Sequence, residues 1–392
     1  MADHALSPSQ AAAIADGVYA LKERTVAEHR ERNAPMSSED PLLDDASGFS
    51  GLTSRRFEAR SGSVFWHELS GFGYIAEGAG ARAGELLIAT RGTATAADAL
   101  TDANFGFVIG PAGKLVHSGF MTCWKSYSRV LETALRGKSP RRIHCVGHSL
   151  GGALAMFNAE HLAQRRVAEV LVYTFGAPRV GDWFQKKSFA SSVGADHIYR
   201  VANIADPIPM VPLFPYFHVD GIPIDTGAGN IAPSAHRMAG TYAPAMAGKT
   251  WGSLQTAAAA RQRAIESQAE FDLALARAIV APMGSAAGYY LIGKALAWLL
   301  KKALLVVGGT MLAATATVLD RLAWLVSEGS ARCKVIADQA KSLLTAVMHF
   351  LGRKAVQAAE VGVAFVRWVL GLLWTSIKIS ADLARVYGYR RG

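Results

Sequence analysis

Cysteine is scarce in this sequence: three residues, Cys123, Cys145 and Cys333, are scattered over a chain of 392. They are too few and too far apart for a disulfide framework or a cysteine-based zinc site, which excludes a small disulfide-stapled fold. The first residues also lack a basic segment followed by an apolar one. We therefore expect no signal peptide, synthesis in the cytoplasm and no export by the general secretory route.

Long apolar runs are lacking too, and acidic residues are scarce in the last third. The uncharged run 303–319 has 17 residues, whereas a bilayer-spanning helix needs about 20. From Ala257 to the end there are 17 Lys and Arg against 8 Asp and Glu, while the preceding residues carry a net charge of +1. The first 256 residues, here called the front, are thus near neutral and long enough to bury a large core. Residues 257–392, here called the back, are basic and apolar.

What the sequence does contain is a G-x-S-x-G pentapeptide, Gly147-His148-Ser149-Leu150-Gly151. This pattern is typical of a nucleophile elbow, a sharp turn that presents a serine between a strand and a helix. Its glycines allow strand and helix backbones to approach without a Cβ clash. The pentapeptide alone is weak evidence, but an apolar strand candidate, 143–146, precedes it and an Ala/Leu-rich helix candidate, 150–162, follows it.

We interpret Ser149 as a nucleophile on these grounds. The N–H of Leu150, at the start of the following helix, is expected to stabilise a developing oxyanion. The alternative is an ordinary connection between a strand and a helix that carries a surface serine.

The segments around the pentapeptide alternate between strand and helix patterns. Mainly apolar runs at 85–90, 167–175 and 197–201 fit buried strands, and short alternating segments before residue 76 predict antiparallel strands at one edge. We therefore expect an α/β fold of the α/β-hydrolase kind, with a mostly parallel central sheet. Residues 216–224 are expected to form a further strand or a hairpin.

A serine nucleophile needs a histidine base, and the histidine needs a carboxylate partner. In α/β-hydrolases both follow the serine, the acid first. Asp206 comes just after a strand, where catalytic groups of open α/β sheets gather, so we favour it as the acid. The alternative interpretation is that Asp206 only forms a turn. The other downstream acids are Asp182, Asp220 and Asp225. His218 and His236 are both late enough to be the base; the loop position of His236 favours it, but the residues leave both open.

Five segments taken together resemble the class 3, or fungal-type, lipase family. In order they are ATRGT (89–93), VHSGF (116–120), VGHSLGG (146–152), TFGAPRVG (174–181) and RVANIADPIP (200–209). The resemblance covers roughly residues 10 to 245. It implies an α/β-hydrolase that performs acyl transfer without a metal or another cofactor.

Carried over by position, the resemblance implies Ser149 as nucleophile and Asp206 as acid. The stretch from His236 to Tyr242 loosely matches the late segment that holds the family's catalytic histidine, which implies His236 as base. His218 matches a non-catalytic histidine of the family.

The resemblance also implies an oxyanion hole. Thr93 falls at the family's first oxyanion donor, beside the second donor Leu150, and Asp102 matches an acid that holds the Thr93 hydroxyl. Gly147 and Gly151 support the elbow. Between Thr93 and Asp102, where fungal members carry an amphipathic lid helix, this chain has a single large apolar side chain.

The resemblance stops near residue 255, so we divide the chain into a hydrolase domain, 1–254, and a helical region, 255–392. Apolar stretches with interspersed basic residues fill the latter at 287–300, 303–319, 343–351 and 361–377.

One interpretation of this region is a helical bundle docked on the hydrolase domain. The other is a membrane-engaging region, interfacial or inserting, in which basic residues meet anionic lipid head groups. Its expected interface anchors are Trp298, Trp324, Trp368 and Trp374. Nucleic-acid binding is not expected, because the basic residues alternate with apolar rather than polar runs.

The combined prediction is a lipolytic ester hydrolase of phospholipase A type that its tail brings to membranes. Residues 6–21 resemble the start of bacterial lipase-type effectors delivered by contact-dependent secretion. That resemblance implies an antibacterial toxin exported by a specialised secretion system to target-cell membranes, with an immunity protein or secretion chaperone as partner. The alternatives are a membrane-permeabilising protein whose tail is the active part, and a soluble intracellular esterase.

Overall fold

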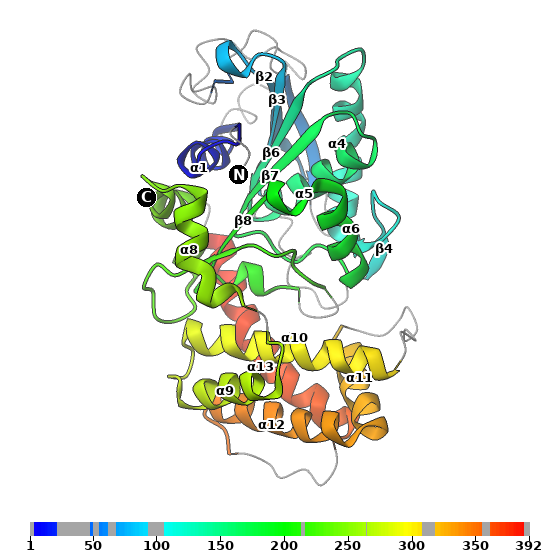
Figure 1. Cartoon of the computed structure of the whole chain (residues 1–392), viewed down its shortest axis with the longest axis vertical. Helices are drawn as coiled ribbons and strands as arrows, with labels where there is room; N and C mark the ends of the chain where they lie inside the picture. Colours follow the sequence, from blue (N-terminus) through cyan, green and yellow to red (C-terminus); the bar gives the residue numbers. More distant parts are fainter. Residues whose placement is uncertain are drawn as a thin grey trace.

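The computed structural model describes residues 4–21, 48–49, 55–61, 68–92, 106–212, 216–263, 265–307, 318–354 and 361–387. Within these ranges, a sheet flanked by helices forms the front of the chain, and a group of helices below it forms the back (Figure 1).

Among the described residues the main sheet has seven strands, in the spatial order β1-β2-β3-β6-β7-β8-β9. One edge is antiparallel, as predicted, and consists of β1 (Arg55–Ser61), β2 (Glu68–Glu77) and β3 (Glu85–Thr90). From β3 onward the neighbouring strands run parallel through β6 (Arg142–His148), β7 (Glu169–Phe175), β8 (Ile198–Asn203) and β9 (Ile222–Ile224). The expected α/β class with a mostly parallel sheet is thus confirmed.

Helices cover both faces of this sheet (Figure 1). On one side lie α1 (Pro8–Gly17) and α8 (Trp251–Gln262); on the other lie α4 (Ser118–Leu135), α5 (Leu150–Gln164) and α6 (Trp183–Val193). The central strand β6 is therefore buried along its whole length, including its polar residues Arg142, His144 and His148. A short antiparallel pair, β4 (Phe107–Ile109) and β5 (Leu115–His117), precedes α4.

Residues 216–224 do not form the hairpin that was one of the two expectations. Phe217 makes an isolated bridge to Gly181, whereas Ile222–Ile224 pair in parallel with β8. The two ends of the segment find different partners, and the strand alternative holds only for the last three residues.

The back of the chain is helical, as expected. It contains α9 (Gln268–Val280), α10 (Ala286–Val307), α11 (Val318–Arg332), α12 (Lys334–Phe350) and α13 (Val363–Tyr387). These helices share an apolar core of their own, and Ile208 and Val211 of the front join it. Helix α13 leaves the bundle and runs back toward α8 (Figure 1).

Two expectations about this region need correction or refinement. Trp298 and Trp374, expected as interface anchors, are buried in the bundle core, because both point into the contacts between helices; Trp368 is 43% exposed.

Trp251 and Ala258 of α8 belong to the core of the front part, against the sheet. We therefore move the proposed domain boundary from residue 254 to the segment between α8 and α9.

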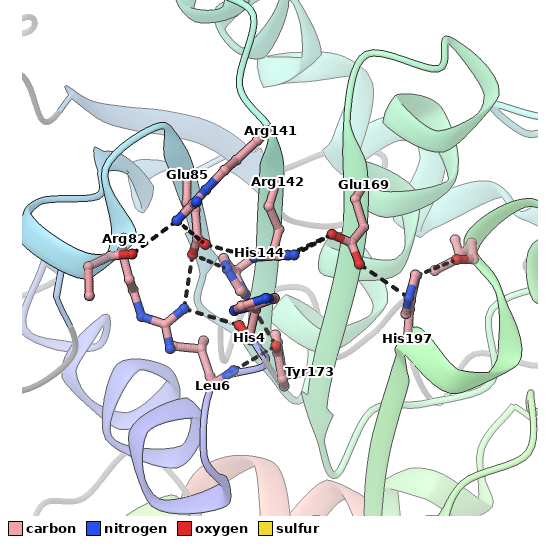
Figure 2. A network of polar contacts seen from close by, with 12 residues as sticks. His4, Leu6, Arg82, Glu85, Arg141, Arg142, His144, Glu169, Tyr173 and His197 are labelled. Atoms are coloured by element: carbon pink, nitrogen blue, oxygen red, sulfur yellow. Dashed lines mark hydrogen bonds and ion pairs between the residues drawn. The ribbon is translucent and has the colours of Figure 1, made fainter. Parts of the chain in front are cut away.

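A buried polar network joins the first residues of three parallel strands (Figure 2). Glu85, Arg142 and Glu169 begin β3, β6 and β7 and lie side by side in the strand register. The Glu85 carboxylate accepts hydrogen bonds from Arg142 Nη1 at 2.7 Å, Arg82 Nη1 at 2.9 Å and His144 Nε2 at 3.0 Å. Each buried charge thus has an opposite charge in contact, as burial requires.

The network sets the protonation of two of its members. Burial alone would raise the pKa of Glu85, but hydrogen bonds from His144 and Arg82 outweigh it and lower the pKa from 4.5 to about 2. Burial lowers the pKa of His144 below 6.5, so its ring stays neutral near pH 7. Its Nε2–H then donates to Glu85, and its Nδ1 accepts from the Tyr173 hydroxyl at 3.1 Å.

Both shifts predict a loss of stability in acid. The folded state keeps Glu85 ionised between pH 4.5 and about 2, where the unfolded state takes up a proton, and His144 adds a loss that begins as pH falls below 6.5. We expect Glu85→Gln to lower the free energy of unfolding at pH 7 by about 3 kcal/mol, because it leaves buried cations short of a partner. Urea denaturation between pH 3 and 7 measures both effects.

The matched control is Glu77→Gln, which removes the partner of Lys138 in an exposed ion pair. Its effect should stay within about 0.5 kcal/mol. If Glu85→Gln keeps the wild-type pH dependence, the network does not cause the acid sensitivity.

Candidate active site

Ser149 occupies a strained turn between β6 and α5. Its backbone has φ 58° and ψ −132°, a region that L-residues rarely adopt. The two glycines of the pentapeptide make this turn possible. A Cβ on Gly147 would lie 2.2 Å from the Gly151 carbonyl oxygen, and one on Gly151 would lie 2.2 Å from the Thr90 carbonyl oxygen. The local sequence therefore folds into the elbow geometry that its spacing predicts.

The structure brings the three predicted triad residues into one line of hydrogen bonds. His236 Nε2 lies 2.8 Å from Ser149 Oγ, and His236 Nδ1 lies 2.8 Å from Asp206 Oδ2. All three side chains are buried, with Ser149 the most accessible at 7%. Asp206 follows β8, and His236 ends the short helix η5 (Pro233–His236), so the strand ends and a loop supply the group. This arrangement can accept the serine proton and stabilise an imidazolium.

The Asp206 carboxylate is fixed from both sides. Its Oδ1 accepts the backbone N–H of Ile208 at 2.9 Å, and its Oδ2 accepts the hydroxyl of Tyr242 at 2.6 Å. Tyr242 in turn accepts the backbone N–H of Asn203 at 3.0 Å. Burial, followed by the charge of Asp206, raises the pKa of Tyr242 well above its usual value of 10, so the hydroxyl remains a donor.

His148, the residue before the serine, holds the backbone of His236 through a hydrogen bond. Its Nε2 donates to the backbone carbonyl of His236 at 2.7 Å, and the Tyr19 hydroxyl donates to its Nδ1 at 2.7 Å. Burial lowers the pKa of His148 well below 6.5, so the ring stays neutral and keeps this pattern. The Tyr19 hydroxyl also accepts the Gly92 N–H at 3.3 Å. Sequence reasoning missed Tyr19, because 129 positions separate it from His148.

The oxyanion side of the site is described in part. Leu150 is buried and begins α5, with its N–H in the first turn of the helix. Thr93 and Asp102 lie outside the described residues. Gly92, the residue before Thr93, is held by Arg91. The buried Arg91 side chain donates to the Gly92 carbonyl at 3.0 Å and lies over the Phe72 ring. Arg91 stands in the ATRGT segment, but nothing in the sequence assigns it this contact.

The alternative bases and acids have other partners. His218 donates from Nε2 to the Pro209 carbonyl at 2.6 Å. Asp182 caps α6 by accepting the Gln185 N–H at 2.7 Å. Asp220 pairs with Lys186 at 2.8 Å, and Asp225 pairs with Arg261 at 3.0 Å. The geometry therefore separates His236 from His218, which the sequence left open.

Comparison with known proteins agrees with this architecture. Residues 87–216 match the sequence model of the class 3 lipase family. This segment of the chain is thus similar to that family. It is 32% identical over 155 residues to secreted mono- and diacylglycerol lipase 1 of Fusarium solani, covering 36% of this chain and 46% of the relative.

Other relatives align over shorter stretches. Phospholipase A1 EG1 of Oryza sativa subsp. indica is 35% identical over 91 residues, covering 22% of this chain and 20% of the relative. Toxin TseL of Vibrio cholerae serotype O1 is 33% identical over 101 residues, covering 26% and 15%. The crystal structure of the lipase from Rhizopus microsporus var. chinensis has 24% identity and a TM-score of 0.41, covering 56% of this chain and 73% of that one.

The chain thus spans less than half the length of each of these three sequence relatives. The family match, together with relatives named as lipases and phospholipases, supports a carboxylic-ester hydrolase. The residues beyond 216 lie outside the match to the family's sequence model.

The hydrogen bond from Tyr242 to Asp206 makes a specific prediction. Tyr242→Phe removes that bond and the acceptor of the Asn203 N–H, and it should lower kcat for a soluble p-nitrophenyl ester by about tenfold, since bonds to charged groups contribute about 1.5–3 kcal/mol. Tyr199→Phe is the matched control: within the described part of the chain, its buried hydroxyl has no hydrogen-bond partner. Equal kcat values for the two variants would contradict a role of Tyr242 in supporting Asp206.

Proposed function

We propose that the protein is a serine-dependent lipolytic hydrolase that cleaves acyl esters of membrane phospholipids, a phospholipase of A type. The observation that carries this proposal is the buried line from Ser149 through His236 to Asp206, with both contacts at 2.8 Å. The class 3 lipase match supports the same reaction class.

The proposed reaction is acyl transfer through Ser149. Its Oγ attacks the ester carbonyl while its proton passes to His236 Nε2, and Asp206 stabilises the imidazolium. The N–H of Leu150, with Thr93 as the other expected donor, stabilises the oxyanion. His236 then gives the proton to the departing alcohol. A water molecule, deprotonated by His236, hydrolyses the acyl-enzyme and releases the fatty acid.

The phospholipid substrate is proposed from the relatives and from the tail. The relatives' names include an acylglycerol lipase and a phospholipase A1. Of the described helices, α13 is the one that is long and apolar enough to cross a membrane, over Val363–Ala384, and 33% of that stretch is buried. Trp368, Ile379 and Leu383 are exposed along it, at helical spacings that place them on one side.

We propose that α13 lies on a bilayer rather than across it. Its opposite side, including Val366, Leu370 and Leu373, is packed into the bundle core, and a spanning helix would have to leave that core. Arg367 and Lys378 adjoin Trp368 and Ile379 in the chain, and they pair with Asp320 at 2.7 Å and with Asp382 at 3.4 Å. Anionic head groups would have to compete with these aspartates for the two basic side chains.

The biological role that we propose is that of an antibacterial effector toxin. Its support is the resemblance of residues 6–21 to lipase-type effectors and the alignment with a protein named toxin TseL. Specialised secretion to target-cell membranes and neutralisation by an immunity protein belong to this proposal. The second candidate function, membrane permeabilisation by the tail, is favoured by the exposed apolar residues of α13.

The test is incubation of the protein with mixed phospholipid vesicles, followed by mass spectrometry of fatty acid and lysophospholipid. We expect Ser149→Ala to reduce release by about 10³-fold or more, because the nucleophile is lost. Ser128→Ala on α4 is the matched control and should release both products at the wild-type rate. Equal release by wild type and Ser149→Ala would contradict the proposed nucleophile.

The same vesicles distinguish the other candidates. Full leakage of vesicle contents with Ser149→Ala would favour permeabilisation by the tail. Failure of the wild type to float with anionic vesicles, together with cleavage of a soluble ester, would favour an esterase without a membrane substrate.

A further inference from the structure

The loop that carries His236 lies between the Asp206 turn and the helical bundle. On one side, the Ala232 N–H donates to the Ala205 carbonyl at 3.0 Å. On the other side, the Ile231 N–H donates to the Gly284 carbonyl at 3.1 Å. The Ala286 N–H donates to the Gly229 carbonyl at 2.8 Å, and Asn230 and Ser285 form an antiparallel bridge. Residues 284–286, which precede and begin α10, therefore form an outer strand-like support for this loop.

Side-chain packing follows the same path. Ala286 is 2% exposed and shares a small apolar cluster with Ala205 and Ala235. Ala205 precedes Asp206 in the chain, and Ala235 precedes His236. One methyl group of the bundle thus packs with the direct neighbours of the proposed acid and base. The cluster also contains Ile204, and Ile231, Ala232 and Tyr290 pack against it. Because these side chains fill the space around Ala286, a larger side chain at 286 would displace the turns that hold Asp206 and His236.

Residues 284–286 are themselves rigidly placed. The Ser285 N–H donates to the Pro282 carbonyl at 3.0 Å, which closes a turn with Gly284 at φ 79°, the left-handed conformation that favours glycine. The Ser285 hydroxyl then accepts the Gly288 N–H at 3.3 Å and caps the start of α10. Helix α10 is anchored in the bundle core through Ile292 and Leu296.

Helix α13 reaches the same place from another direction. It packs against η5, which ends at His236, and against η4 (Ile208–Met210), which follows Asp206. Figure 1 shows α13 running from the bundle toward the hydrolase part. Helices α10 and α13 of the bundle therefore contact the two loops that carry Asp206 and His236.

We propose that Ala286 is a positioning residue for the reaction, through which the helical bundle holds His236 and Asp206 in line with Ser149. This inference rests on the proposed hydrolase function. It makes the bundle part of the support of the active site, in addition to any membrane role, and it concerns a residue beyond the segment that matches the lipase family.

The test is a series at position 286, assayed with a soluble p-nitrophenyl ester so that membrane binding plays no part. Ala286→Leu should lower kcat by about 10²-fold with little change in KM, because a displacement of about 1 Å of the base has that effect. The kcat of Ala286→Val should lie between those of Ala286→Leu and the wild type, and the kcat of Ala286→Gly should stay close to the wild-type value. If the Leu variant does not fold, the Val and Gly variants carry the comparison.

The kcat per folded molecule separates positioning from stability. A displaced His236 should lower kcat of the folded fraction of Ala286→Leu and Ala286→Val while KM changes little, which a loss of stability alone would not do. Ala340→Leu is the matched control, because it makes the same substitution at a buried site in α12. It should lower the unfolding temperature and leave kcat per folded molecule unchanged.

Two results would overturn the inference. One is a wild-type kcat in folded Ala286→Leu. The other is an equal loss of kcat in Ala340→Leu, which would mean that the bundle acts through stability alone. A wild-type protein that cleaves no ester contradicts the proposed function instead, so the two failures are distinguishable.

Discussion

The placement of His236 is the constraint on which the rest of the site depends. Its ring must meet Ser149 on one side and Asp206 on the other, and both contacts are 2.8 Å long. Here the His148 ring binds the backbone carbonyl of His236, and the preceding loop is bonded both to Ala205 and to Gly284 of the back region. The strained backbone of Ser149 is maintained by the same surroundings.

The two ends of the parallel strands have different tasks. At their beginning, Glu85, Arg142 and Glu169 form a charged row that satisfies buried groups by mutual contact. At their end, β6 leads into the elbow and β8 into Asp206. Ligands of open α/β sheets bind at the carboxyl ends of the strands. The charged row lies at the opposite, amino-terminal ends of the strands, and it stabilises the sheet away from the candidate active site.

Much of the front of the molecule could be predicted from local pattern. The elbow follows from five adjacent residues, and the parallel sheet follows from buried apolar runs, because both depend on short-range geometry. The choice between His218 and His236 could not be made from the residues, since it depends on how two loops fold over the strand ends. Tyr19, in the turn after α1, reaches His148 across 129 positions of sequence, and no spacing rule identifies such a contact.

The back region shows another limit of sequence reasoning. Apolar stretches with basic residues suit a bilayer surface and a bundle core equally well, because both environments select for apolar side chains. Trp298 and Trp374 were expected at a membrane interface, yet they lie in the bundle core, while Trp368 on the same region is exposed. The contact of Ala286 with Ala205 and Ala235 has no sequence signal at all, since alanine is common in any helix.

The central claim is that Ser149 is a nucleophile activated by His236. The most direct measurement is the reaction of the full-length protein with a fluorophosphonate, followed by intact mass and peptide mapping, with His236→Ala as comparison. We expect one adduct per chain, located on the peptide that contains Ser149, and a strongly reduced labelling rate in His236→Ala. No adduct, an adduct on another residue, or equal labelling of the two proteins would contradict the account.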